Sequence, residues 1–166
     1  MADPALVKLS ADLGAALRGR GWSLALAESC TGGWASEVVT MTPGSSSLFE
    51  RGFITYSNDA KIEMLGVAAE TLEKFGAVSE ETVREMAYGA LSHSHAQVSA
   101  AITGIAGPDG GSEQKPVGLV WFGWAGPDGT VKSEKRMFQG SREDVRRQAV
   151  EAALQGVIAL TLSPDL

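Results

Sequence analysis

The chain has 166 residues, of which 44% are hydrophobic and 20% are charged. This length predicts one domain over residues 1–166, and the composition excludes a disordered or fibrous protein. No apolar run approaches the roughly 18 residues that a membrane span needs, and the first residues lack the features of a signal peptide. Fourteen basic and twenty acidic side chains give a net charge of −6. We therefore expect a cytoplasmic protein that binds neither nucleic acid nor a membrane.

Predicted helices and strands alternate along the chain. Leucines at three- and four-residue steps predict a first helix over 5–20, which Gly21 ends. Ser79 and Ser141 have the character of N-caps for two later helices. The remaining elements follow from apolar runs, β-branched residues and turn residues. In chain order they are a strand over 23–27, a helix over 34–41, a strand over 49–56, short helices over 61–65 and 68–75, the helix after Ser79, strands over 98–103 and 117–124, a hairpin strand over 130–138, and the helix from Ser141 to about 160.

This alternation, with one hairpin near the end, predicts an α/β fold. We expect a three-layer α/β/α sandwich with a mixed, mostly parallel sheet. Three predicted strands run into small, polar or glycine-rich turns, at 28–33, 55–61 and 103–108. Ligands of open α/β sheets collect beyond the carboxyl ends of the strands. If the three strands are neighbours in one sheet, their ends form one cleft.

The first of these turns offers a candidate nucleophile. Ser29 lies just before a predicted helix, and Thr31, Gly32 and Gly33 follow it. Unpaired N–H groups in such a turn bind anions and can stabilise the oxyanion of an acyl-transfer reaction. The simpler alternative is that Ser29 or Thr31 only caps the helix.

The second turn offers a candidate base. If Ser57 or Asn58 caps the next helix, Lys61 lies in its first turn, where the helix dipole disfavours a cation. Burial in a cleft would lower the pKa of this lysine and yield a neutral amine that can deprotonate a serine hydroxyl. The alternative is a solvated surface lysine. Tyr56 either hydrogen-bonds the nucleophile or packs with its hydroxyl in water.

Three other features are weaker. Cys30, the lone cysteine, is a rival nucleophile, although a buried inert thiol is the simpler interpretation. His93 and His95 do not share a helical face, and we predict no metal site. The glycine-rich segment 104–111 fits neither common phosphate-binding motif, so it either cradles a phosphate through its amides or only connects two strands. Arg142 is either a phosphate ligand or an ordinary exposed arginine.

Five sequence blocks together resemble the CinA C-terminal-domain family, the nicotinamide mononucleotide deamidases. They are residues 27–33 (AESCTGG), 55–61 (TYSNDAK) with 65–67 (LGV), 76–79 (GAVS), 103–111 (TGIAGPDGG) and 115–118 (KPVG). They occur in the family's order, and the likeness extends from about residue 6 to residue 160. Gln97 departs from it, since an acidic residue is expected before the strand at 98–103.

The resemblance implies an amidohydrolase that converts nicotinamide mononucleotide and water to nicotinic acid mononucleotide and ammonia, in pyridine-nucleotide recycling. It implies a homo-oligomer with no cofactor and no metal. Ser29 is then the nucleophile, Lys61 its general base and Tyr56 an assisting residue. The residues expected to bind substrate are Cys30, Thr31, Gly32, Gly33, Asn58, Thr103, Gly104 and Arg142. Two alternatives remain: a nucleotide-binding or regulatory module without catalysis, and a hydrolase that uses Cys30.

Overall fold

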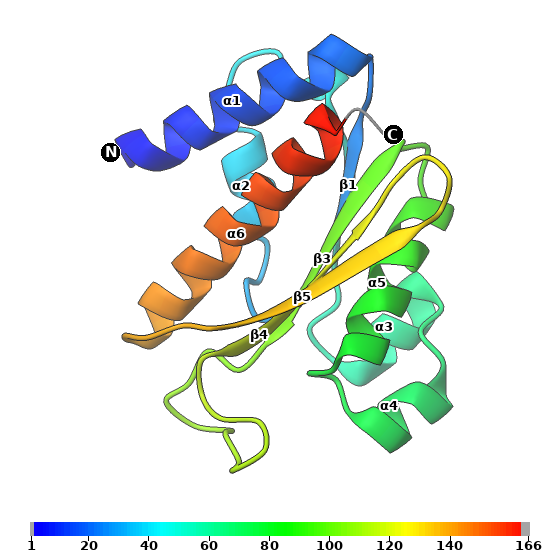
Figure 1. The fold of residues 1–166 in the computed structure, drawn as a ribbon, viewed down its shortest axis with the longest axis vertical. Helices are drawn as coiled ribbons and strands as arrows, with labels where there is room; N and C mark the ends of the chain where they lie inside the picture. The colour runs from blue at the N-terminus through cyan, green and yellow to red at the C-terminus, as the bar shows by residue number, and fades with distance from the viewer. Residues whose placement is uncertain (1, 164–166) are drawn as a thin grey trace.

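A five-stranded sheet in the order β2-β1-β3-β4-β5 forms the middle layer of the computed structural model, which describes residues 2–163 (Figure 1). The strands are β1 (Leu24–Glu28), β2 (Phe49–Ile54), β3 (Val98–Gly104), β4 (Leu119–Ala125) and β5 (Val131–Met137). The α-helices are α1 (Pro4–Arg20), α2 (Trp34–Val39), α3 (Asn58–Leu65), α4 (Ala69–Phe75), α5 (Glu80–Ser92) and α6 (Arg142–Leu162).

The pairing of the strands confirms the predicted mixed sheet. β1 pairs in parallel with β2 on one side and with β3 on the other. β4 runs antiparallel to both β3 and β5, so it alone opposes the direction of the other four strands. Because β2, β1 and β3 are adjacent and parallel, their carboxyl ends lie at the same edge of the sheet.

Helices cover both faces of the sheet, which confirms the three-layer sandwich (Figure 1). Side chains alternate between the faces of a strand. On β1, Leu24 and Leu26 therefore join the core beneath α1, α2 and α6, whereas Ala25 and Ala27 join the core beneath α3, α4 and α5. Both cores are almost free of solvent, so the burial of apolar surface stabilises the sheet from both sides.

Capping residues set the helix boundaries largely as predicted. Gly21 ends α1 in a left-handed conformation with φ of 67°, and Ser79 and Ser141 cap α5 and α6 through their side chains. α3 begins three residues earlier than predicted because Ser57 Oγ accepts a hydrogen bond from the Ala60 N–H. The expected domain bounds include residues 1 and 164–166, which lie outside the described residues.

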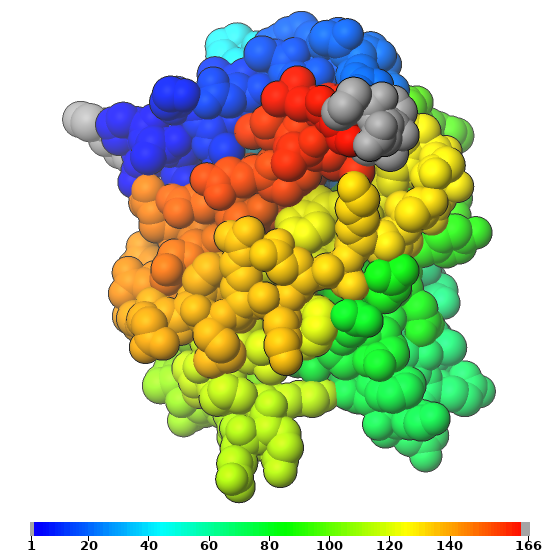
Figure 2. Space-filling view, viewed as in Figure 1, coloured from blue at the N-terminus to red at the C-terminus, as the bar shows by residue number. Residues whose placement is uncertain are grey.

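The connection between β3 and β4 projects beyond the edge of the sheet where the three parallel strands end (Figure 1). In the space-filling view it forms the yellow-green lobe at the bottom of the molecule (Figure 2). This loop contains the glycine-rich segment and a cis peptide bond between Gly107 and Pro108. Lys115 Nζ donates a hydrogen bond to the Phe75 carbonyl and so ties the loop to α4. Within residues 2–163, no helix is long and apolar enough to cross a membrane.

Candidate active site

The ends of β1, β2 and β3 surround one cavity of about 290 Å³. Eight of the residues predicted for the site line it, namely Ser29, Cys30, Tyr56, Asn58, Lys61, Thr103, Gly104 and Arg142. The expected convergence of the three strand ends is therefore confirmed. Thr31, Gly32 and Gly33 do not line it: Thr31 is buried, Gly33 is half-buried and Gly32 is exposed. Ala77, Val78 and residues 105–107 complete the wall together with Asp109 and Gly110.

Ser29 and Lys61, which are 32 residues apart in sequence, meet in this cavity. Lys61 Nζ lies 3.0 Å from Ser29 Oγ and donates a second hydrogen bond of 2.8 Å to the Thr55 carbonyl. Ser29 follows β1 directly, whereas Thr55 follows β2, and Lys61 projects from the first turn of α3. The parallel pairing of β1 and β2 is thus what brings the hydroxyl and the amine together.

Lys61 is almost completely enclosed, with an exposed fraction of 1%. Burial lowers the pKa of its amine, because removal from water penalises the charged form. Its two hydrogen-bond partners, a hydroxyl and a carbonyl, carry no charge that would restore the ammonium form. The interpretation of Lys61 as a solvated surface lysine is therefore wrong, and the amine is suited to accept a proton from Ser29.

Glu28 organises the turn that carries Ser29. Its buried carboxylate accepts hydrogen bonds from the hydroxyls of Thr31 and Ser36 at 2.6 and 2.7 Å. It also accepts from the N–H groups of Gly33, Ala35 and Ser36, at 2.9 to 3.2 Å. Because each of these donors would otherwise be unpaired at the start of α2, Glu28 performs the capping function of that helix.

Two expectations for this turn need correction, the first of them for Gly32 and Gly33 only. The N–H groups of Gly32 and Gly33 are not free, since they donate to the Ser29 carbonyl and to Glu28. Neither Ser29 nor Thr31 caps α2, because the cap residue is Gly33 and it makes no side-chain hydrogen bond. Glu28, a single acidic residue at the end of a buried strand, could have indicated these hydrogen bonds, since a buried carboxylate requires several donors.

Arg146 is a residue of this region that the sequence interpretation missed. From α6 its Nε donates to the Cys30 carbonyl at 3.0 Å, and its Nη2 donates to the Thr31 carbonyl at 3.2 Å. Its guanidinium also lies 5.6 Å from the ring centre of Trp34. Its spacing of four residues from Arg142, which places both on one face of a helix, could have indicated it.

Tyr56 and Arg142 form the rim of the cavity. Tyr56 is 61% exposed, and its hydroxyl accepts a hydrogen bond of 3.1 Å from Arg142 Nη2. Arg142 Nη1 donates to the Gly107 carbonyl at 2.8 Å, so this arginine connects the end of β2 to the glycine-rich loop. The expected hydrogen bond between Tyr56 and Ser29 is not among the contacts of the described residues. The Tyr56 hydroxyl is therefore a hydrogen-bond acceptor for Arg142.

Thr103 and Gly104 shape the floor of the cavity. The Thr103 hydroxyl is already committed to the Ala77 carbonyl at 2.8 Å. A Cβ atom on Gly104 would lie 2.7 Å from Val120 Cγ2, so packing of β3 against β4 requires glycine here. Asn58, at the first position of α3, lines the same cavity and is exposed. Of these three residues, Asn58 has the side chain best placed to meet a ligand.

The thiol of Cys30 is a poor candidate for the nucleophile. Burial raises its pKa to about 11, so the reactive thiolate is scarce at neutral pH. Lys61 Nζ makes its hydrogen bond to Ser29, and not to this sulfur. The geometry therefore favours the serine.

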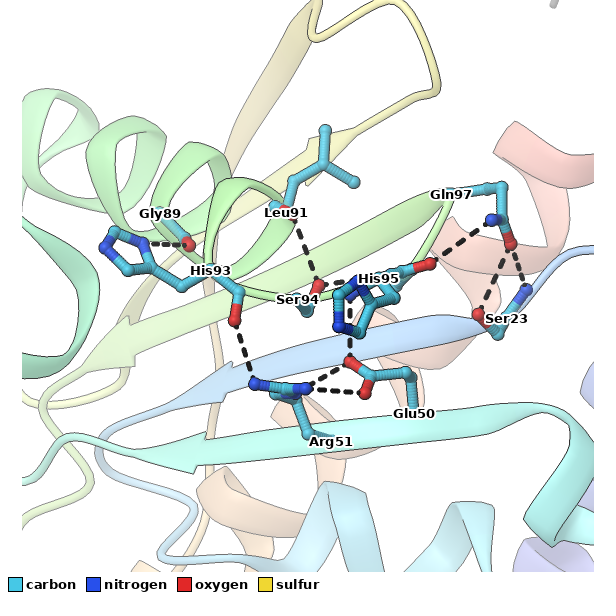
Figure 3. A network of polar contacts seen from close by, with 10 residues as sticks. Ser23, Glu50, Arg51, Gly89, Leu91, His93, Ser94, His95 and Gln97 are labelled. Atoms are coloured by element: carbon cyan, nitrogen blue, oxygen red, sulfur yellow. Dashed lines mark hydrogen bonds and ion pairs between the residues drawn. The ribbon is translucent and has the colours of Figure 1, made fainter.

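At the opposite edge of the sheet, a second polar network contains both histidines (Figure 3). His93 Nδ1 lies 2.8 Å from the Gly89 carbonyl, and the His95 N–H donates to Glu50. Gln97, which departs from the family pattern, uses its Oε1 to accept from the Ser23 N–H at 2.8 Å, as an acidic residue would. Residues 2–163 contain no cluster of three or more His, Cys, Asp or Glu side chains that could hold a metal ion.

Comparisons with known proteins agree with these features. The sequence is 54% identical over 155 residues to nicotinamide-nucleotide amidohydrolase PncC of Enterobacter agglomerans and to the protein of that name from Escherichia coli K12. In both cases the alignment covers 93% of this chain and 94% of the relative. The crystal structure of competence/damage inducible protein CihA from Agrobacterium tumefaciens superposes with a TM-score of 0.92 at 43% identity, over 96% of this chain and 98% of the other.

The sequence model of the CinA C-terminal domain matches residues 6–161. This range contains every residue that lines the cavity, Ser29 and Lys61 included. The chain belongs to the CinA C-terminal domain family.

Proposed function

We propose that this protein is an amidohydrolase that converts nicotinamide mononucleotide and water to nicotinic acid mononucleotide and ammonia. The observation that carries the proposal is the buried Lys61 amine, 3.0 Å from Ser29 Oγ, in a chain that is 54% identical to nicotinamide-nucleotide amidohydrolases. A carboxamide is unreactive, so its hydrolysis needs an activated nucleophile, a stabilised oxyanion and a proton for the leaving ammonia. The Ser29 turn and Lys61 together supply groups for all three.

In the first half of the proposed reaction, neutral Lys61 accepts the Ser29 hydroxyl proton while Ser29 Oγ attacks the carboxamide carbon. One N–H of the amine remains bound to the Thr55 carbonyl, which leaves the nitrogen lone pair for Ser29. The tetrahedral intermediate then breaks its C–N bond, and Lys61 returns the proton to the departing amine as ammonia. The product of this half is an ester between Ser29 and the nicotinoyl group.

In the second half, water attacks the ester carbonyl and gives its proton to Lys61. The C–O bond to Ser29 breaks, Ser29 regains the proton from Lys61, and nicotinic acid mononucleotide leaves. No redox step or metal is needed for this balance. The cycle ends with the neutral amine and the serine hydroxyl restored.

The rim of the cavity supports recognition of a mononucleotide. Arg142 is exposed there, and its fork is suited to a phosphate once it exchanges its contact with the Tyr56 hydroxyl. Asn58 and Asp109 line the same cavity and offer polar groups for the ribose. A volume of about 290 Å³ is near the lower end for small-molecule sites. A cytoplasmic location, a role in pyridine-nucleotide recycling and homo-oligomeric assembly remain predictions within this proposal.

An ammonia-release assay on nicotinamide mononucleotide, with and without a chelator, tests the proposal. We expect turnover that the chelator does not change. A protein that is stabilised by the nucleotide but releases no ammonia would instead be the non-catalytic binding module. Loss of activity with chelator would overturn the metal-free mechanism.

A further inference from the structure

The turn after Ser29 contains two N–H groups that make no hydrogen bond to another residue. Among the hydrogen bonds of the described residues, neither the Cys30 N–H nor the Thr31 N–H donates to a neighbouring residue, and the one contact of the Cys30 N–H is with the thiol of Cys30 itself. Cys30 is 7% exposed and Thr31 is 0% exposed, so water does not readily replace the missing acceptors. Buried N–H groups are almost always paired, and exceptions are characteristic of functional sites.

The location of these groups suggests their role. Cys30 lines the cavity directly beside Ser29. The N–H of the residue that follows a nucleophile is a common donor to the oxyanion of acyl-transfer enzymes. At the start of α2, the N–H groups of Gly33, Ala35 and Ser36 already donate to Glu28, so these groups are not available to bind the oxyanion.

Three hydrogen bonds fix the directions of these two N–H groups. The peptide bonds of this turn are trans, so each C=O points away from the N–H of its own peptide plane. Arg146 Nε binds the Cys30 carbonyl and thereby orients the Thr31 N–H. Arg146 Nη2 binds the Thr31 carbonyl, whose plane carries the Gly32 N–H. That N–H donates to the Ser29 carbonyl at 3.1 Å, which in turn orients the Cys30 N–H.

We propose that Arg146 is a positioning residue, which holds the backbone of the Ser29 turn so that the Cys30 N–H can stabilise the oxyanion. Thr31 is fully buried and does not line the cavity, so its N–H is not part of this proposal. This inference rests on the proposed amidohydrolase function. Arg146 reaches two carbonyls at once because its guanidinium is a planar fork, and contact with Trp34 fixes the plane of that fork. Lysine carries the same charge but cannot make both bonds in this geometry.

The test is steady-state ammonia release by Arg146→Lys, with Arg147→Lys as the matched control. Arg147 is the next residue of α6, but its side chain binds Asp3 and Glu151. We expect Arg146→Lys to lower kcat by roughly 10- to 100-fold. We expect KM, and the affinity for nicotinic acid mononucleotide, to change by less than about threefold because Arg146 does not line the cavity. Arg147→Lys should keep the kcat of the wild type.

Melting temperatures and circular dichroism of both variants, together with Arg146→Met, separate positioning from folding. A loss of kcat in folded Arg146→Lys and Arg146→Met supports the inference. An unchanged kcat in Arg146→Lys would overturn it. So would a parallel loss of kcat, substrate affinity and thermal stability, since that pattern indicates a merely structural residue. A wild-type protein that releases no ammonia would refute the proposed function itself, before any variant is compared.

Discussion

Charged side chains have different surroundings at the two ends of the parallel strands β2, β1 and β3. At their amino ends, Arg51 binds Glu50 at 2.7 Å and the His93 carbonyl at 3.1 Å (Figure 3), and both charged side chains are partly exposed to solvent. At their carboxyl ends, Lys61 is buried with only a hydroxyl and a carbonyl as partners.

This difference separates a structural network from a reactive one. A paired, exposed charge keeps its ordinary protonation state and contributes little energy. A buried amine without a counter-ion is unstable as a cation, and that instability lowers its pKa and favours the neutral form that the proposed reaction requires. Substitutions at the two ends should therefore have very different effects on activity and on stability.

Removal of the amine should have the largest effect among the substitutions of this comparison. Lys61→Met retains the length of the side chain but leaves Ser29 without a base, so we expect ammonia release to fall by about 10²- to 10⁴-fold. Lys61→Arg should be equally inactive because guanidinium does not deprotonate. Activity within tenfold of the wild type in either variant would contradict the role of Lys61.

Titration of the Lys61 amine should affect the pH dependence of both the activity and the free energy of unfolding. The proposed mechanism requires neutral Lys61, so kcat/KM should rise with pH through a pKa below the ordinary value of 10.5. Between that lowered pKa and 10.5 only the unfolded chain holds the proton, so the free energy of unfolding also rises with pH. Urea titrations should detect this rise in the wild type and not in Lys61→Met. Identical pH profiles for the two would contradict the burial of a titrating amine.

Tyr56→Phe should have an intermediate effect on substrate binding. The variant loses the hydrogen bond from Arg142 but leaves the bond between Arg142 and Gly107 in place. We expect KM to increase by about 2- to 10-fold, with kcat within about twofold of the wild type. A kcat loss of 100-fold would instead indicate that the Tyr56 hydroxyl takes part in proton transfer.

Cys30→Ala should retain most of the activity. The thiol has a pKa raised to about 11 and packs as a small apolar group, so its removal should lower stability by less than about 2 kcal/mol. We expect kcat within about threefold of the wild type. Inactivation of this variant, together with inactivation of the wild type by thiol alkylation, would favour a cysteine nucleophile.

Glu50→Gln, at the other end of the strands, should have the smallest effect. We expect kcat to remain unchanged and the free energy of unfolding to fall by less than about 1 kcal/mol. Hydrogen bonds from Arg51 lower the pKa of the Glu50 carboxyl from its ordinary value of 4.5. The difference from the wild type should thus be present above pH 4.5 and disappear as the pH falls through the lowered pKa. A loss of activity in Glu50→Gln as large as that in Lys61→Met would contradict the distinction between the amino and carboxyl ends of the parallel strands.

The sequence predicted the elements of the site better than its hydrogen bonds. Glycine and serine caps, together with strand-length apolar runs, defined the fold, because these signals are local. The position of Lys61 in the first turn of a helix broke a local rule, and such exceptions often mark functional residues.

The hydrogen-bond partners of the backbone groups in the Ser29 turn could not be predicted from local sequence signals. Glu28 reaches donors up to eight residues away, and Arg146 contacts a carbonyl 116 residues away in sequence. Contacts of this kind depend on the packing of α2 and α6 against the sheet. The sequence therefore indicated that the turn after β1 either binds an anion or caps a helix, but it did not indicate which N–H groups of the turn lack a partner.

Ammonia release from nicotinamide mononucleotide by Ser29→Ala, measured beside Cys30→Ala, tests the central claim most directly. The two residues are adjacent, and both line the cavity next to the Lys61 amine. We predict that Ser29→Ala loses at least about 10³-fold in kcat while its melting temperature stays close to that of the wild type. A Ser29→Ala protein with near-normal turnover would show that the hydroxyl beside Lys61 is not the nucleophile.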